Sequence, residues 1–331
     1  MENVNSYIII TSIFPPTEAI GKFGALPDYK LVVVADKKTP VEWYSPNVKL
    51  LSVKEQTDSV YAISSLLPYN HYCRKMIGYL YAMQTGASII IDTDDDNIPN
   101  TVWNFPAMEG KYNAVKGETG FVNIYSHYTS KKIWPRGLPL RLINDTTPLP
   151  VISNVDAKVG VWQGLADEDP DVDAIYRLTN GDYCYFEDKP PLILSKGTVC
   201  PFNSQNTLFV KELFPLLYLP SFVTFRFTDI LRGIVAQPIM WLYNYSLGFT
   251  KATVVQKRNV HDYTRDFESE IPMYLHIETV LETAMATASS RFSISDNLMN
   301  IYMNLLKKNI ITEKELQLLE CWLKDVQRLN Q

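Results

Sequence analysis

Three short apolar runs rich in β-branched residues shape the first hundred residues of this chain. They span residues 7–12, 31–36 and 88–92, and each stops abruptly on a polar side chain. Runs of this length predict strands that are buried on both faces, as in a parallel sheet. Apolar residues at helical spacing within 70–84, followed by Gly86 as a C-terminal cap, predict a crossover helix. The sequence therefore predicts an α/β fold with a Rossmann-like, mostly parallel sheet flanked by helices.

The pattern is less regular beyond residue 100. Residues 101–152 are rich in Gly, Pro, Tyr and Asn, which predicts loops and short β elements. Strands are expected again around 159–162 and 197–199, and a long helix through 228–245. After about residue 277 the chain is expected to be helical, with apolar residues at helical spacing behind a capping box.

Composition excludes several classes of protein. The 331 residues carry a net charge of −5, which argues against nucleic-acid binding because phosphate neutralisation needs clustered Lys and Arg. The N-terminus lacks the pattern of a signal peptide, and no apolar run approaches the roughly 18 residues of a membrane helix. The four cysteines are scattered without a C-x-x-C pair, which argues against a zinc site and a disulfide framework. We expect a cytoplasmic protein without a transmembrane segment.

An acidic cluster directly after the third strand is the strongest chemical signal. Asp92, Asp94, Asp95 and Asp96 place four carboxylates within five residues. Crowded anions repel one another, so such a cluster needs solvent or a divalent cation to screen it. Carboxylate oxygens suit Mg²⁺ or Mn²⁺, which bind through few protein ligands plus substrate phosphates. We predict a metal at Asp94, Asp95 and Asp96, with Asp92 structural; the alternative is a solvated acidic loop.

A D-x-D element after a strand has a defined catalytic role in glycosyl transfer. A metal held there bridges the two phosphates of a nucleotide diphosphate and neutralises the charge of the departing diphosphate. The residues 94–99 resemble the DDD-x-x-P element of the reversibly glycosylated polypeptide, or UDP-arabinopyranose mutase, family. A closer resemblance, to the STELLO-type glycosyltransferase-like family, covers about 230 residues through the segments VVVADKKTP (32–40), GYLYAMQTGA (78–87), DTDDDNIP (92–99), DEDPDVDAIYRLT (167–179), PFNSQNTLF (201–209), TDILRG (228–233) and QKRNVHDY (256–263).

The resemblance implies a GT-A fold with Mn²⁺ or Mg²⁺, a nucleotide-diphosphate sugar donor, UDP-sugar favoured, and a glycan or other hydroxyl acceptor, as in polysaccharide biosynthesis. A catalytic domain would cover 1–270, with a nucleotide-binding half at about 1–100 and an acceptor-facing half at about 101–270. A C-terminal helical region would follow at 271–331. It could pack on the catalytic domain or on a second copy, so a homo-oligomer stays open.

The resemblance also implies roles for individual residues. The nucleotide would contact Thr11, Ser12, Asp36, Arg74, Lys75 and Asp94. For Asp36 the alternative is a turn-forming residue, and for Arg74 and Lys75 a solvated helix face. His261 would complete the metal shell beside Asp94, Asp95 and Asp96.

The acceptor or sugar would lie near a second polar set. Trp162 would stack on a sugar face, joined by Asp167, Asn203, Gln205, Arg232 and Arg258. An inverting transfer needs a base within hydrogen-bond reach, and Asp229 is our first choice, with Asp169 and Asp173 behind it. Asp229 and Arg232 lie three residues apart on an expected helix, so they could simply pair with each other.

Three other functions remain open at this point. A nucleotide-sugar mutase would change the sugar ring without an acceptor. A haloacid-dehalogenase-like phosphatase would use Asp92 as nucleophile and Asp94 as acid/base, although two strands precede the site. A non-catalytic scaffold would have kept the fold alone.

Overall fold

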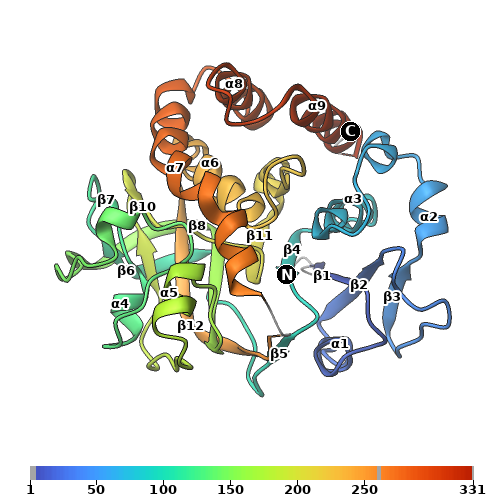
Figure 1. Ribbon diagram of the computed structural model, residues 1–331, viewed down its shortest axis with the longest axis horizontal. Coiled ribbons are helices and arrows are strands. Elements are labelled where there is room, and N and C mark those ends of the chain that lie inside the picture. The colour runs from blue at the N-terminus through green and yellow to red at the C-terminus, as the bar shows by residue number, and fades with distance from the viewer. Residues whose placement is uncertain (1–4, 259–261, 330–331) are drawn as a thin grey trace.

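The computed structural model describes residues 5–258 and 262–329, which form an α/β fold around a ten-stranded sheet (Figure 1). The strand order is β3-β2-β1-β4-β11-β8-β6-β9-β12-β5, with an additional pairing between β8 and β12, and β7 and β10 form a separate two-stranded sheet. The first part of the chain forms β1 (Ser6–Ser12), α1 (Glu18–Gly24), β2 (Tyr29–Ala35), β3 (Val48–Leu51), α2 (Val53–Thr57), the 3-10 helices η1 (Ala62–Ser65) and η2 (Tyr72–Arg74), α3 (Lys75–Gln84), β4 (Ile89–Thr93) and β5 (Asn97–Pro99).

The second part of the chain supplies the remaining strands and most of the helices. It forms β6 (Glu109–Val115), β7 (Gly120–Phe121), α4 (Tyr125–Tyr128), η3 (Leu140–Leu142), β8 (Val151–Glu168), α5 (Ala174–Thr179), β9 (Leu192–Leu194), β10 (Thr198–Val199), β11 (Asn206–Val210), η4 (Lys211–Leu217), α6 (Thr228–Leu242), β12 (Tyr245–Gln256), α7 (Tyr263–Thr287), α8 (Ile294–Lys307) and α9 (Glu313–Leu329).

The predicted α/β class is confirmed, and the parallel part of the sheet is β3-β2-β1-β4. Strand β1 pairs in parallel with β2 and β4, with Ser12 opposite Ala35 and Ile9 opposite Asp92. Because these strands run the same way, their carboxyl ends meet at one edge. Beyond β4 the sheet is mixed, since β11 pairs antiparallel with both β4 and β8. Short apolar runs cannot distinguish these orientations, because strands buried on both faces look alike in either.

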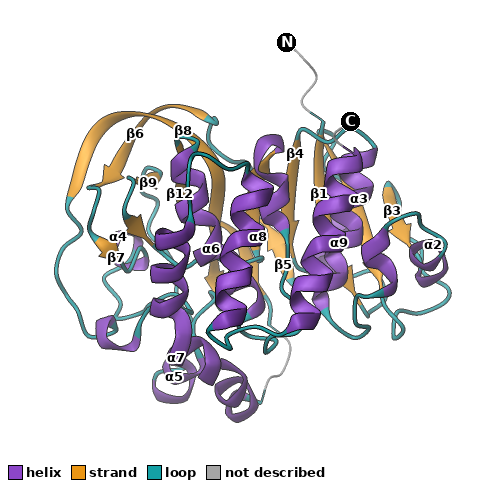
Figure 2. Cartoon of the chain, turned by 90° about the horizontal axis from the view of Figure 1, so that it is seen from above, coloured by secondary structure: helices purple, strands orange, loops and turns teal. Residues whose placement is uncertain are grey.

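The crossover helix α3 lies against the first two strands. Gly78 makes this close approach possible, because a Cβ there would lie 2.6 Å from Ile9 Cγ2 and 2.8 Å from Val34 Cγ2. Gly86 adopts a φ of 83° after the helix, as expected of a C-terminal cap. Figure 2 shows α3, α6, α8 and α9 over one face of the sheet, and Figure 1 shows α1 on the other side of β1 and β2.

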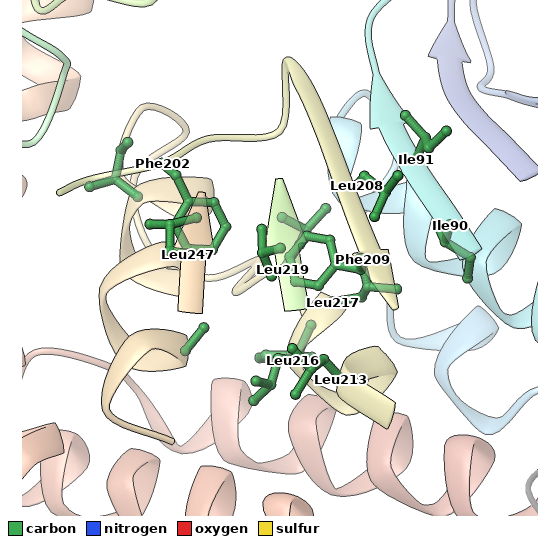
Figure 3. Close-up of a cluster of buried hydrophobic side chains, with 14 of the residues drawn as sticks. Ile90, Ile91, Phe202, Leu208, Phe209, Leu213, Leu216, Leu217, Leu219 and Leu247 are labelled. Atoms are coloured by element: carbon green, nitrogen blue, oxygen red, sulfur yellow. The ribbon is translucent and has the colours of Figure 1, made fainter. Parts of the chain in front are cut away.

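A continuous apolar core joins the parallel strands to the mixed part of the sheet. Side chains from β4, β11, η4 and β12 meet in this core (Figure 3), and each buried Leu, Ile or Phe contributes roughly 1.5–3 kcal/mol. The labelled side chains of the cluster are Ile90, Ile91, Phe202, Leu208, Phe209, Leu213, Leu216, Leu217, Leu219 and Leu247.

Two buried carboxylates fix the last helix to the α/β body. Glu315 accepts hydrogen bonds from the backbone nitrogens of Ser221 (3.1 Å) and Phe222 (2.6 Å). Asp325 accepts from the backbone nitrogens of Ala62 and Ile63, both at 3.0 Å. The C-terminal helices therefore pack on the body of the same chain. Among the described helices, none combines the length and apolar character needed to cross a membrane.

Candidate functional site

A cavity of about 340 Å³ opens where the parallel strands end. Ser12 ends β1, Asp36 follows β2, and Asp94 follows β4, so the topology delivers their side chains to one place. The opposite wall comes from the loops before η3, α5, β11 and α6, from the first turn of α6 and from the end of β12. The cavity is lined by Thr11, Ser12, Ile13, Phe14, Asp36, Lys38, Asn70, His71, Tyr72, Asp94, Asp95, Asp96, Arg136, Asp171, Asn203, Ser204, Gln205, Phe225, Arg226, Asp229, Gln256 and Arg258.

The three acidic residues after β4 all reach this cavity, each with a different partner. Asp94 Oδ1 lies 2.6 Å from Lys75 Nζ, and Asp95 Oδ2 accepts from Ser12 Oγ. Asp96 Oδ2 accepts weakly from Gln256 Nε2 at 3.4 Å. Asp96 Oδ1 is buried and has no hydrogen-bond partner among the described residues. A buried acceptor without a partner is costly, so Asp96 retains capacity for a ligand.

Burial and crowding make these carboxylates hold protons more tightly than usual. Burial raises the pKa of Asp94 to about 7, and the charge of Asp96 adds to the rise although Lys75 opposes it. Burial likewise raises the pKa of Asp95 to about 6, and it raises the pKa of Asp96. Burial is the main cause of each rise, and a cation bound beside these carboxylates would lower their pKa values.

The residues fit a divalent cation that takes only part of its shell from protein. Within residues 5–258 and 262–329, no three His, Cys, Asp or Glu side chains form a complete metal cage. Mg²⁺ and related ions commonly use one or two carboxylates and complete their shell with water and substrate phosphates. Asp94 and Asp96 would be such ligands, with Asp95 held by Ser12. His261, the remaining predicted ligand, lies outside the described residues.

A buried chain of charges supports the cluster from behind. Asp92 is fully buried, with Oδ1 2.8 Å from Lys75 Nζ and Oδ2 2.8 Å from Arg232 Nη1. Asp92 thus occupies the structural position that we expected. Arg232 does not line the cavity, because its guanidinium is committed to Asp92 and to the carbonyl oxygen of Asn203 (2.9 Å). Arg232 therefore does not form the pair with Asp229 along the helix that we considered as an alternative.

Asp229 pairs instead with an arginine that sequence reasoning missed. Arg136 donates to both oxygens of Asp229 at 3.0 Å and to both oxygens of Asp171 at 2.8 Å. Asn203 Nδ2 donates to Asp171 Oδ2 at 2.8 Å. Burial works to raise the pKa of Asp229, but Arg136 outweighs it and the pKa is lowered. A paired carboxylate with a lowered pKa is a weak proton acceptor, which argues against our first choice of base.

Asp36 takes the turn-forming role that we considered and also lines the cavity, while its contact with a nucleotide stays a prediction. Its Oδ1 accepts from the backbone nitrogen of Lys37 (2.6 Å) and its Oδ2 from that of His71 (3.3 Å), so it shapes the loop while lining the cavity. His71 stacks on Tyr72 with ring centroids 5.2 Å apart, and Phe225 lies 5.0 Å from His71. Burial lowers the pKa of His71 to about 4, so the ring is neutral near pH 7. The cavity therefore has an uncharged aromatic wall.

Arg74 and Lys75 are both buried, so the solvated helix face that we considered for them is wrong. Lys75 contacts Asp94, as described above. Arg74 lies elsewhere, because its Nε and Nη2 donate to Gln56 Oε1 at 2.8 and 2.6 Å and its guanidinium covers the ring of Tyr69. These contacts occupy Arg74 away from the cavity, and the expected nucleotide contact is corrected accordingly.

Trp162 cannot stack on a sugar, which corrects our expectation. The indole is fully buried, packs 5.3 Å from the ring of Tyr112 and donates to the carbonyl oxygen of Ala107 at 3.3 Å. Residues 159–166 of β8 are buried on both faces of the sheet, whereas the first part of the strand is mostly exposed. Trp162 ends the strand expected at 159–162, and the sequence did not reveal its burial because its neighbours in space, Ala107 and Tyr112, come from another segment.

The acidic run 167–173 contributes a different residue from those expected. Asp171 lines the cavity, whereas Asp167, Asp169 and Asp173 do not. Asp167 accepts from a backbone nitrogen, Asp169 Oδ2 lies 2.8 Å from Arg258 Nε, and Asp173 is the N-cap of α5. The structure thus places neither reserve candidate for the base in the cavity. Thr11, Asn203, Gln205 and Arg258 line it as expected.

Eight cavity residues lie outside every predicted site and every segment that carried the resemblance: Ile13, Phe14, Asn70, His71, Tyr72, Arg136, Phe225 and Arg226. Arg136 and Phe225 fall outside every motif, and the pairings of Arg136 span 35 and 93 residues of sequence. Asp171 and Gln256 lie inside two of the segments that carried the family resemblance, so those segments were the available clue.

The fold and cavity define an α/β protein with an acidic, arginine-walled site at the carboxyl edge of its parallel strands. Residues 226–331 match the family model described as STELLO glycosyltransferases. The chain is also 25% identical to "Probable glycosyltransferase STELLO2" and to "Probable glycosyltransferase STELLO1" of Arabidopsis thaliana, over 97% of its own length and 44% of theirs. These matches confirm the similarity to the STELLO-type family, and the chain spans less than half the length of these relatives.

A comparison of structures adds a distant likeness. A crystal structure of a mycobacterial protein shares 10% identity and a TM-score of 0.39, covering 86% of this chain and 76% of that one. A TM-score at this level carries no argument about function.

Proposed function

We propose that this chain is a divalent-metal-dependent glycosyltransferase. It would transfer a sugar from a nucleotide-diphosphate donor, with a UDP-sugar favoured, to a glycan or another hydroxyl acceptor. The observation that supports the proposal is the cluster of Asp94, Asp95 and Asp96 in the cavity, where Asp96 Oδ1 is buried without a hydrogen-bond partner among the described residues. The names of the two plant relatives support the same class of activity.

Mn²⁺ or Mg²⁺ bound at this cluster would supply neutralisation of the diphosphate leaving group. Among the chain's own residues, Lys75 holds Asp94 in place from within the core. Arg226 and Arg258 present cationic side chains to the cavity, where a diphosphate can accept hydrogen bonds. The neutral ring of His71, beside Asp36, offers a surface for the nucleoside end of the donor.

Asp171 and Asp229 play a different part in this proposal. Arg136 keeps both carboxylates ionised, so they act as hydrogen-bond acceptors for sugar hydroxyls instead of exchanging protons. Asn203 extends the same surface with an amide that touches Asp171. Fixed acceptors of this kind orient a sugar ring, which is the main requirement for transfer at one chosen hydroxyl.

The experiment is a turnover assay with a panel of UDP-sugars, with Mn²⁺ or Mg²⁺, and with oligosaccharide acceptors. We expect release of UDP and a lengthened acceptor, and we expect Asp96→Asn to lower turnover by about a hundredfold or more. The exposed Asp58→Asn is the matched control. Conversion of the sugar ring without an acceptor would indicate a mutase instead. Absence of turnover and of nucleotide binding would contradict the proposal.

We also propose a cytoplasmic location. All four cysteines are free thiols, and three of them are buried. Reduced cysteines are usual in proteins of reducing compartments. Fractionation of cells with an antibody to this chain tests the location directly.

A further inference from the structure

Two exposed tyrosines lie near Lys257, on a short segment that is anchored to the end of β8. Tyr183 is 65% and Tyr185 61% exposed, whereas Cys184 between them is buried. Cys184 forms an antiparallel bridge with Glu168, with N···O distances of 2.8 and 2.9 Å. Because alternate residues of an extended segment face opposite ways, the two phenol rings share the outer side.

The segment is held at several points, so its rings are presented from a fixed backbone. Lys131 Nζ donates to the carbonyl oxygen of Tyr183 at 2.8 Å. The backbone nitrogen of Phe186 donates to Asp167 Oδ1 at 2.9 Å, and the Phe186 ring packs edge-on against Tyr125. Exposed aromatic rings on a rigid backbone lose little entropy when they bind.

A line of contacts connects the tyrosines to the metal-binding carboxylates. The backbone nitrogen of Lys257 donates to the carbonyl oxygen of Asp96 at 2.9 Å. Lys257 Nζ lies 2.6 Å from Glu168 Oε2, directly at the bridge to Cys184. The hydrogen bond to Glu168 is the main cause of the raised pKa of Lys257, and both phenols lie near enough to contribute. The tyrosine pair therefore lies near Lys257, whose sequence neighbours Gln256 and Arg258 line the cavity.

The backbone at this junction is under strain. Glu168 adopts a φ of 69°, in the left-handed region that residues other than glycine rarely adopt. The turn lets Glu168 reach Lys257 while the next residue, Asp169, pairs with Arg258 of the cavity wall. Strained residues of this kind concentrate at binding sites.

We propose that Tyr183 and Tyr185 form a platform on which the acceptor saccharide stacks as it enters the cavity. The platform rests on the proposed transferase function and defines its acceptor as a saccharide chain of more than one ring. The apolar face of a pyranose packs on an exposed aromatic ring, while Lys257 and Glu168 offer a donor and an acceptor to its hydroxyls. The platform takes the stacking role that we had expected of Trp162.

The test compares saccharide binding with nucleotide binding in the same proteins. Saturation-transfer NMR with neutral α-1,4-, β-1,3- and β-1,4-linked hexasaccharides, in the presence of UDP and Mn²⁺, measures saccharide binding to the platform. Calorimetry with UDP and Mn²⁺ measures the affinity of the donor site for UDP. The variants are Tyr183→Ala/Tyr185→Ala, the ring-preserving Tyr183→Phe/Tyr185→Phe, and Phe292→Ala, an exposed aromatic in the link between α7 and α8.

We expect the double Ala variant to weaken hexasaccharide binding about tenfold, since two stacking contacts are lost, with UDP affinity unchanged. The double Phe variant and Phe292→Ala should bind like the wild type. The platform is refuted if the wild type binds none of the hexasaccharides, or if the double Ala variant binds them equally well. Failure of the wild type to bind UDP would instead count against the proposed transferase function.

Discussion

Lys75 Nζ lies 2.6 Å from Asp94 Oδ1, and the lysine is fully buried while the aspartate faces the cavity. The same ammonium is 2.8 Å from Asp92 Oδ1, inside the core. Burial alone would lower the pKa of Lys75, but Asp92 and Asp94 raise it above its ordinary value, so the side chain stays protonated. The ammonium of Lys75 on α3 thus links buried Asp92 in the sheet to Asp94 at the cavity.

Replacing this lysine should damage the fold itself. Lys75→Met leaves Asp92 with Arg232 alone and Asp94 without its cation, and breaking a buried ion pair costs about 3–5 kcal/mol. Urea unfolding followed by circular dichroism measures the loss. The control is Lys54→Met, whose solvent-exposed pair with Asp58 should contribute little to stability. Equal stability of Lys75→Met and the wild type would show that the pair is dispensable.

A substitution at Gly248 tests the packing of Trp162 in the sheet, and a substitution at Gly21 is the control. A Cβ at Gly248 would lie 2.3 Å from Trp162 Cζ3, so Gly248→Ala should destabilise the protein by about 1–3 kcal/mol. Gly21 lies in α1 with nothing within 4 Å of its Cβ position, so Gly21→Ala should stabilise by roughly 0.4–1 kcal/mol. Thermal unfolding of both variants is the measurement. If Gly248→Ala does not lower the melting temperature, the indole of Trp162 does not pack against Gly248.

Glu315 predicts a specific dependence of stability on pH. Burial raises the pKa of Glu315 to about 7, although Tyr218 and two backbone nitrogens oppose the rise. The folded state therefore holds the proton more tightly than the unfolded chain, whose pKa is near the ordinary value of 4.5. The free energy of unfolding should then fall between pH 4.5 and 7, by up to about 1.4 kcal/mol per pH unit from this group.

Glu315→Gln should flatten that slope, because the amide does not titrate and its oxygen still accepts a hydrogen bond. Urea unfolding at a series of pH values measures the difference between variant and wild type. Glu313→Gln, at an exposed position in the same helix, should leave the slope unchanged. Parallel slopes for the wild type and Glu315→Gln would exclude a titrating Glu315.

Local pattern was enough to find the acidic side of the site. Ser12, Asp36 and Asp94 each lie at the end of an apolar run, and strand geometry brings such ends together whatever the rest of the fold. The position of Gly86 could be predicted for the same reason, since a helix cap depends on neighbours in sequence. The antiparallel pairing of β11 with β4 could not be predicted from the local sequence pattern.

The arginine side of the site could not be predicted, because its contacts are long-range. Arg136 lies in the irregular stretch 101–152 and meets Asp229 across 93 residues. Spacing along a helix allowed a pair of Asp229 and Arg232 as an alternative, but Asp229 pairs with Arg136 and Arg232 with Asp92. The burial of Trp162 could not be predicted for the same reason, because Tyr112, which packs against its indole, belongs to another strand.

Calorimetric titration of UDP tests the central claim most directly. The claim is that Asp94 and Asp96 hold a divalent ion against a diphosphate. UDP should bind the wild type with Mn²⁺ present, and its Kd should rise at least about tenfold with EDTA or in Asp96→Asn, but not in Asp58→Asn. Equal UDP affinity with Mn²⁺ and with EDTA, or in Asp96→Asn and the wild type, would contradict the account.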